Sequence, residues 1–78
     1  MATPSLPEAF GKILREYRTK AGYSQEGLAD LAGCDRTFIG MLERGQRQPT
    51  LDTLFRIATA LEVSPATLVA RTSTELTK

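Results

Sequence analysis

The sequence predicts an all-α fold of five short helices in a single domain. Three observations support this prediction. Apolar residues recur at helical spacing, one helix-starting pattern occurs four times, and no segment alternates apolar and polar residues as a half-buried strand does. We expect the domain to span residues 8–71, with a flexible arm at 1–7 and a flexible tail at 72–78, because both ends lack a usable pattern.

The first expected helix covers residues 8–21. Ser5 and Glu8 have the spacing of a capping box, and Pro7 falls in the first turn, where its missing N–H is tolerated. The apolar residues follow one helix face: Phe10, Ile13, Leu14, Tyr17 and Ala21.

Four later helices are predicted at 25–32, 36–44, 51–61 and 65–71 by a repeated start. Each time, an apolar residue precedes a capping residue, and a second apolar residue follows five positions after the first. In this hydrophobic staple the two apolar residues pack on each other across the cap. The four instances are Tyr23-Ser24 with Leu28, Cys34-Asp35 with Ile39, Pro49-Thr50 with Leu54, and Val63-Ser64 with Leu68.

The second and third helices are joined by a very short segment. Gly33 suits a left-handed helix end, Cys34 a small buried position, and Asp35 the cap of the next helix. Two short helices joined by three or four residues form a helix-turn-helix.

The second helix of this motif, expected at 36–44, has one apolar and one polar side. Ile39 and Leu42 fall on the first side, with Phe38 at its edge. The second side begins with an arginine and a threonine. In helices that read DNA, first-turn side chains contact base edges in the major groove. The residues of this second side are Arg36, Thr37, Gly40 and Arg44, with Met41 at the margin.

Composition limits the classes of function. The chain has no histidine and one cysteine. It has no glycine-rich phosphate loop, and its nine acidic residues are scattered among basic ones. We therefore expect no enzyme, no metal site and no cofactor. A net charge of +1 does not by itself indicate nucleic acid, although basic residues are concentrated in 12–20 and 36–47.

The 78 residues contain no apolar run of the ~18–20 residues that a membrane span needs, and the start lacks the pattern of a signal peptide. We therefore expect a cytoplasmic protein with no membrane contact. We also expect no small-molecule effector, because the chain has no second domain to bind one.

The run SQEGLADLAGCDRTFIGMLERGQRQPTLDTLFRIATALEVSPATL resembles the compact five-helix, lambda-repressor-like DNA-binding domain of the phage-repressor, or XRE-type, family. The similarity covers about residues 9–71. The markers are Ser24-Gln25-Glu26, Leu28-Ala29, Gly33, Ile39, Leu42-Glu43-Arg44-Gly45, Pro49, Leu54 and Ala60-Leu61-Glu62-Val63. Residues 35–39 also resemble the recognition helix of restriction–modification controller proteins.

The resemblance implies a sequence-specific transcriptional regulator of double-stranded DNA, a repressor or autoregulator that reads the major groove as a homodimer. It implies that Arg18 pairs with Glu43 and that Gln25 binds a phosphate. The other implied contacts are Arg36 and Thr37 with bases, Phe38 with the sugar-phosphate edge or a thymine methyl, Met41 with a neighbouring base pair, and Arg44, Gln46 and Arg47 with the backbone.

Two alternatives stay open. Phe38 could belong to the core instead of the DNA-binding surface, because Phe38 and Leu42 are four residues apart. The same fold could also act as an antitoxin-like module that binds a protein. For a dimer, the expected surface is the last helix and its flanks, namely Leu61, Val63, Leu68 and Val69.

Overall fold

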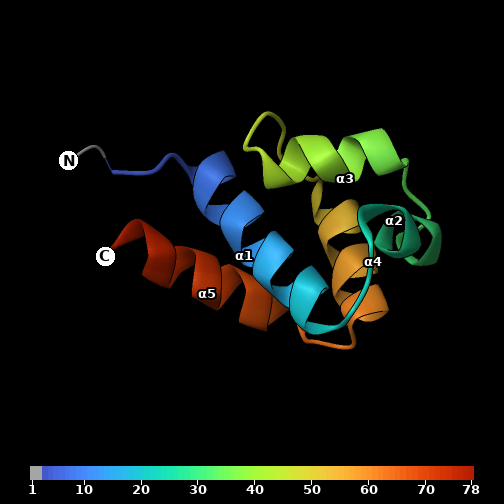
Figure 1. The fold of residues 1–78 in the computed structure, drawn as a ribbon. Helices are drawn as coiled ribbons and strands as arrows, with labels where there is room; N and C mark the ends of the chain where they lie inside the picture. The colour runs from blue at the N-terminus through green and yellow to red at the C-terminus, as the bar shows by residue number, and fades with distance from the viewer. Residues whose placement is uncertain (1–2) are drawn as a thin grey trace.

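The computed structural model describes residues 3–78 and contains five helices in those residues, with no strand. This confirms the predicted all-α fold. The helices are α1 (Leu6–Lys20), α2 (Gln25–Ala32), α3 (Arg36–Glu43), α4 (Leu51–Leu61) and α5 (Pro65–Leu76) (Figure 1).

Side chains cap the amino ends of all five helices, as local sequence chemistry predicts. At α1 the Ser5 backbone N–H donates to the Glu8 carboxylate at 2.9 Å, and the Glu8 N–H donates to the Ser5 hydroxyl. This capping box satisfies two N–H groups that the helix itself leaves free. The caps of the other four helices are Ser24, Asp35, Thr50 and Ser64.

The predicted flexible arm at residues 1–7 extends too far, because its last residues belong to α1 and its cap. Because Ser5 is the cap, the helix begins at Leu6 and includes Pro7 in its first turn. The first two residues of the expected arm lie outside the described part of the chain.

The predicted flexible tail at 72–78 is also wrong, because α5 continues to Leu76. Two polar residues of the helical turns beyond residue 71 are buried, and both have hydrogen-bond partners. The Thr72 hydroxyl donates to the Leu68 carbonyl at 2.8 Å, and the Glu75 carboxylate pairs with Lys12 of α1 at 2.6 Å. An apolar pattern could not reveal this extension, since its inward face is polar.

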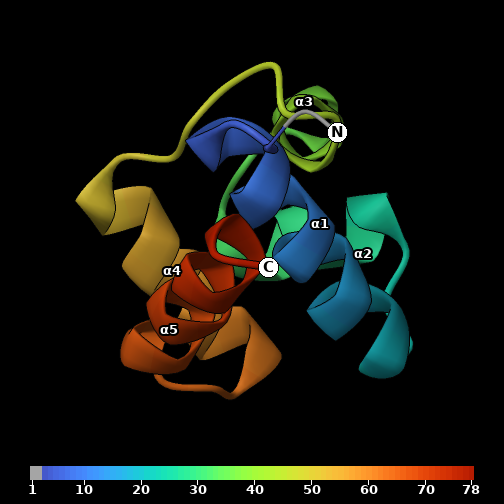
Figure 2. The same ribbon diagram turned by 90° about the vertical axis from the view of Figure 1, so that its left-hand side faces the viewer.

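The core lies where α1 packs on α5 and α3, and where α2 packs on α3 and α4. Two views at right angles place α3 and α5 on opposite sides of the molecule, with α1 between them (Figures 1 and 2). The second apolar residue of every staple is buried: Leu28, Ile39, Leu54 and Leu68. Leu61 and Leu68 therefore belong to the core, and of the four expected dimer residues only Val69 is more than half exposed, at 54%.

Gly11 lets α1 approach the carboxyl end of α3. A Cβ at this position would overlap the backbone carbonyl oxygen of Leu42 and would lie 2.7 Å from that of Glu43. The absence of a side chain at Gly11 thereby allows the short distance between α1 and the carboxyl end of α3.

No single helix among residues 3–78 has the length and apolar character to cross a membrane. The helices α4 and α5 meet that test only when taken together, and they are bent by 105° at their junction.

Candidate nucleic-acid interface

The turn between α2 and α3 has the conformation that the sequence predicts. Gly33 adopts the left-handed conformation with φ of 69°, and Asp35 accepts a hydrogen bond from the Thr37 N–H at 3.1 Å. Cys34 packs partly buried against the core. Arg56 of α4 adds a brace, because its guanidinium donates to the Gly33 carbonyl at 3.2 Å. The start of α3 is thus fixed from both sides of the turn.

The helix α3 divides into a buried and an exposed side. Ile39 and Leu42 are fully buried beneath it. Arg36 and Thr37, the two residues predicted to contact bases, are both exposed at its amino end. The amino end of α3 therefore offers a guanidinium and a hydroxyl to solvent.

A shallow polar hollow lies between the start of α2 and the exposed side of α3. It is lined by Gln25, Arg36, Thr37, Gly40 and Arg44. It thus gathers four of the predicted contact residues from two helices.

The sequence places Gly40 on the polar side of α3, but in the structure another side chain covers it. It is buried, and a Cβ built on it would lie 3.0 Å from the Arg44 Nη1 atom and 3.6 Å from the Gln25 Oε1 atom. The Arg44 guanidinium therefore covers Gly40, and DNA can approach this backbone only if the arginine side chain moves.

An ion pair holds α1, α2 and α3 together beside this hollow. Arg18 donates to both carboxylate oxygens of Glu43, at 2.6 and 3.0 Å, which confirms the expected pair. It also donates to the Tyr23 carbonyl at 2.8 Å. The side chains are only 11% and 4% exposed, and the bonded carboxylate raises the pKa of Arg18 above its ordinary value.

The same carboxylate orients Gln25, a contact that the sequence analysis did not anticipate. The Gln25 Nε2 atom donates to the Glu43 Oε1 atom at 3.1 Å. Since a carboxylate only accepts hydrogen bonds, this contact fixes which end of the amide faces Glu43. The remaining Nε2 hydrogen stays available for a phosphate, the role that the resemblance implies for Gln25.

Phe38 lies at the edge of the core and also supports a basic residue. It is half-buried and packs against the core cluster. The Arg47 guanidinium lies over its ring, 5.9 Å from the centroid. The core role of Phe38 is therefore present, whereas its contact with DNA stays a prediction. Met41 is half-buried at the neighbouring margin.

The remaining predicted backbone contacts lie at the exposed turn that follows α3. The Arg44 Nε atom donates to the Gln46 Oε1 atom at 3.2 Å, and Arg47 is exposed beyond them. Gly45, with φ of 73°, packs so closely on α1 that a Cβ would lie 2.9 Å from the Glu8 side chain. This contact fixes the turn relative to α1.

The arginines of this region carry no compensating carboxylate. Among residues 3–78, Arg36, Arg44 and Arg47 have no acidic group within ion-pair distance. The charge of an unpaired guanidinium is not neutralised by the protein, so the group can bind phosphate or donate to the O6 and N7 atoms of guanine.

Comparisons with known proteins agree with this geometry. A sequence model described as Helix-turn-helix matches residues 14–68. The control protein C.SmaI of Serratia marcescens is 41% identical over 66 residues, which cover 85% of this chain and 79% of that protein.

Solved structures extend the likeness to three dimensions. The restriction-modification controller protein C.AhdI from Aeromonas hydrophila is 48% identical with a TM-score of 0.78, over 80% of this chain and 94% of that chain. The controller protein C.Esp1396I, solved as a tetramer in complex with its natural 35-base-pair operator, is 31% identical with a TM-score of 0.84. That match covers 96% of this chain and 99% of the other. This chain therefore belongs to the helix-turn-helix family of the XRE, or phage-repressor, type.

Proposed function

We propose that this protein is a transcriptional regulator that binds double-stranded DNA at specific sequences, without enzymatic activity, and acts as a repressor or autoregulator. The observation that carries the proposal is the exposed amino end of α3, where Arg36 and Thr37 face solvent beside a turn that is braced from α4. Its relative C.Esp1396I is known in complex with its operator. Because a regulator of this kind has to reach its DNA, we also propose a cytoplasmic location.

The roles divide between bases and backbone. Arg36 donates to guanine O6 and N7, and Thr37 contacts the adjacent base. Met41 adds an apolar contact, and Phe38 touches the sugar-phosphate edge. Phosphates bind Gln25, Arg44, Gln46 and Arg47, and these contacts set the register without selecting a sequence.

We also propose that two copies bind together. One short helix reads only a few base pairs, and a two-fold dimer places two such helices about 34 Å apart, one turn of DNA. C.Esp1396I binds its operator as a tetramer, so higher assembly is compatible with this fold.

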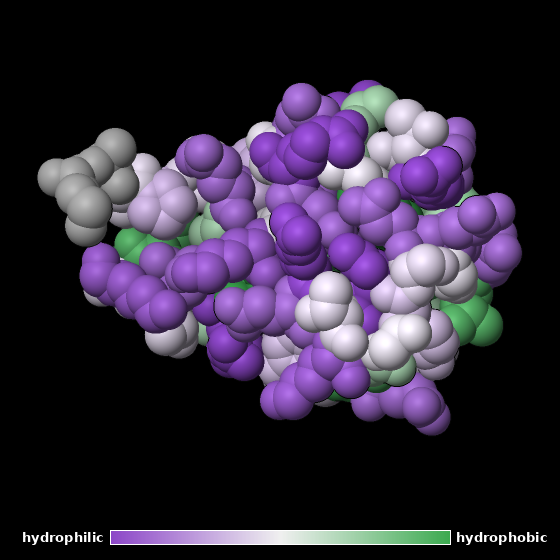
Figure 3. All heavy atoms as spheres, viewed as in Figure 1, coloured by the Kyte–Doolittle hydropathy of each residue, from purple (hydrophilic) through white to green (hydrophobic). Residues whose placement is uncertain are grey.

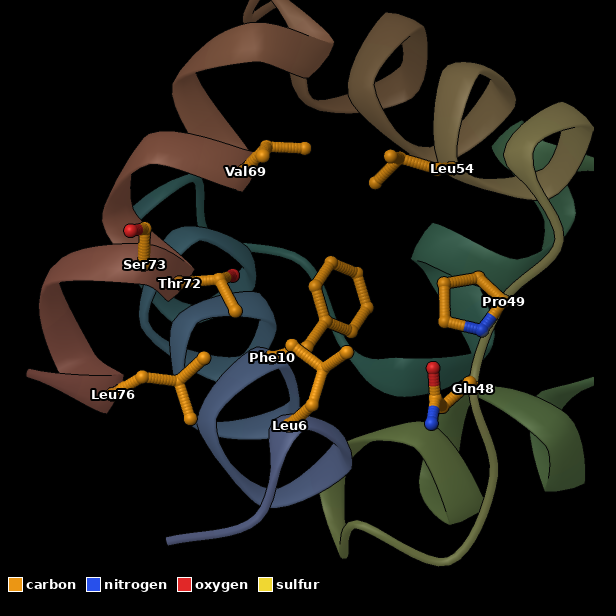
Figure 4. A pocket seen from close by; sticks show the side chains of 9 residues that line it. All are labelled: Leu6, Phe10, Gln48, Pro49, Leu54, Val69, Thr72, Ser73 and Leu76. Carbon is orange, nitrogen blue, oxygen red and sulfur yellow. The ribbon is translucent and has the colours of Figure 1, made fainter. Parts of the chain in front are cut away.

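The second copy would cover an apolar groove of about 270 Å³ between the start of α1, the segment before α4 and the second half of α5 (Figure 4). The Phe10 ring points into this groove, and Leu6 and Val69 on its rim are 48% and 54% exposed. Apolar surface of this kind is stabilised when a partner removes it from water.

Selection of bound duplexes from random DNA tests the DNA-binding proposal. The wild-type protein should enrich one motif, and two inverted half-sites in that motif would support the dimer. Arg36→Ala should relax the preference at one position of each half-site, by about 1–3 kcal/mol of discrimination. No enriched motif with the wild type would contradict the proposal and would favour a protein-binding module instead.

Sedimentation tests the dimer separately. Val69→Glu should shift the protein toward monomer, whereas Leu31→Glu, which places the same charge at an exposed leucine outside the groove, should not. A wild type that sediments as a monomer at high micromolar concentration would contradict the dimer, and dissociation caused by Leu31→Glu alone would place the interface elsewhere.

A further inference from the structure

Half of the basic residues of the chain have no acidic partner within residues 3–78. Five of the ten lysines and arginines lie within 4 Å of a carboxylate: Lys12, Arg18, Arg56, Arg71 and Lys78. Among residues 3–78 the other five have no such partner. Three of these are Arg36, Arg44 and Arg47, which the proposed function uses. The two that it does not use are Arg15 and Lys20, both exposed on α1.

Arg15 lies on the same surface as the proposed interface. It lines a hollow between α1 and the carboxyl end of α3, and Arg44 lines the opposite side of that hollow. Arg44 also borders the hollow that contains Gln25, Arg36 and Thr37. The two hollows are therefore neighbours that share Arg44, and mostly hydrophilic residues cover the face where α1 passes below α3 (Figure 3).

Two of the three acidic groups that line the hollow are paired with arginines, and the third accepts from a backbone N–H. Glu43 accepts from Arg18 and Gln25, Glu16 pairs with Arg71 at 3.1 Å, and Glu8 accepts from the Ser5 N–H at 2.9 Å. Lys12 in turn pairs with Glu75. Glu8 bonds only a neutral N–H and keeps its charge, so among residues 3–78 the hollow has two unpaired guanidinium groups, on Arg15 and Arg44, against one unpaired carboxylate.

We propose that Arg15 binds a backbone phosphate of the DNA that flanks the base pairs read by α3. This inference rests on the proposed function and extends its footprint onto α1. Because the two hollows share Arg44, a strand bound at Gln25 that continued past Arg44 would bring its next phosphates to Arg15. Contacts of this kind add affinity and register but carry no sequence information.

The test uses the duplex obtained by selection in two lengths, one limited to the selected motif and one extended by about six base pairs on each side. The affinity of the full-length protein is measured over a series of salt concentrations. Arg15→Ala is compared with Lys20→Ala, which removes an equally unpaired and exposed charge from α1. Lys20 does not line the hollow, and at 100° per residue it points about 140° away from Arg15.

Arg15→Ala should weaken binding to the long duplex about threefold to tenfold and lower the salt slope by about 0.9, the value for one phosphate. On the short duplex it should bind like the wild type, and Arg15→Lys should keep most of the affinity for the long one. Lys20→Ala should match the wild type on both duplexes, and every variant should select the same motif.

Three results would overturn the inference: wild-type affinity of Arg15→Ala on the long duplex, an equal loss on both duplexes, or an equal loss for Lys20→Ala, which would indicate general charge attraction. Each of these leaves the proposed function intact if the wild type binds its motif. Failure of the wild type to bind any duplex would overturn both proposals.

Discussion

Two arginines of this chain lie over aromatic rings in nearly the same way but on opposite sides of the molecule. Arg47, after α3, lies 5.9 Å from the ring centroid of Phe38, and Arg71, on α5, lies 5.7 Å from that of Tyr17. Arg71 also pairs with the Glu16 carboxylate at 3.1 Å, whereas Arg47 has no acidic partner among residues 3–78. Both arginines therefore stack on an aromatic ring, but only the charge of Arg71 is neutralised by a carboxylate.

The same difference separates the wider surfaces. Every basic residue of α4 and α5 and at the carboxyl end, Arg56, Arg71 and Lys78, is paired with a carboxylate. No basic residue of α3 or the turn after it is paired with an acidic group in the described part of the chain. Paired charges stabilise the fold and leave little field for a ligand, whereas unpaired guanidinium groups gathered on one face indicate a polyanionic partner. The arrangement of partners is thus more informative here than the net charge of +1.

The largest expected effect comes from the buried ion pair that supports α3. Glu43→Gln leaves Arg18 largely buried without its carboxylate and should lower the free energy of unfolding by about 2–4 kcal/mol. Glu16→Gln makes the same chemical change in the half-exposed pair with Arg71 and should cost less than about 1 kcal/mol. Urea denaturation of both variants measures the contrast, and equal losses would contradict the structural role of the Arg18–Glu43 pair.

The close approach of α1 to α3 is tested by Gly11→Ala. The added methyl meets backbone oxygens that cannot move independently, so we expect a loss of about 1–3 kcal/mol and a displaced α3 with weaker DNA binding. Gly27→Ala is the control, because its Cβ would meet only the Ser24 hydroxyl oxygen, at 3.2 Å. Its stability should stay within about 1 kcal/mol of the wild type. A Gly11→Ala protein as stable as the wild type would show that the helices can separate freely here.

The two stacked arginines offer a direct test of the comparison on DNA. Arg47→Ala should weaken binding to all sequences alike and reduce the salt slope by about 0.9. Arg71→Ala combined with Glu16→Gln removes an arginine with the same stacking together with the carboxylate that it neutralises, and this double variant should change neither quantity. Fluorescence anisotropy at several salt concentrations measures both, and an equal effect of the two variants would remove the distinction between the surfaces.

The smallest expected effect is the pH dependence of the pair at the end of α5. Hydrogen bonds from Lys12 and Lys78 hold the pKa of Glu75 below its ordinary value of 4.5. A lowered folded-state pKa stabilises the fold at pH values above 4.5, and this contribution is lost as the pH falls through the folded value.

Melting temperatures of the wild type and Glu75→Gln should therefore differ at neutral pH and converge in acid. Glu26→Gln, which removes an exposed carboxylate that forms no ion pair within residues 3–78, should run parallel to the wild type. If the melting temperatures of the wild type and Glu75→Gln differed by the same amount at every pH, ionisation of Glu75 would not contribute to stability.

The parts of the fold that the sequence predicted correctly depend on chemistry within a few residues. The capping box of Ser5 and Glu8 and the left-handed Gly33 are settled by neighbours in the chain, so a single sequence reveals them. The exposure of Arg36 and Thr37 also followed from helix periodicity, because Ile39 and Leu42 fix the buried side.

The missed features depend on partners that are distant in the sequence. The last turns of α5 are held by Glu75 and its pair with Lys12, 63 residues away. The Gln25–Glu43 bond and the Arg56 brace on Gly33 join different helices. The covering of Gly40 was missed because the conformation of the Arg44 side chain decides it, and periodicity carries no information about that.

The most direct test of the central claim is a nuclear magnetic resonance titration of the labelled protein with the selected duplex. We predict that the side-chain and backbone shifts of Gln25, Arg36, Thr37 and Arg44 change most, while those of Arg56 and Arg71 stay near their free values. Changes concentrated on α4 and α5, with the amino end of α3 unaffected, would contradict the account.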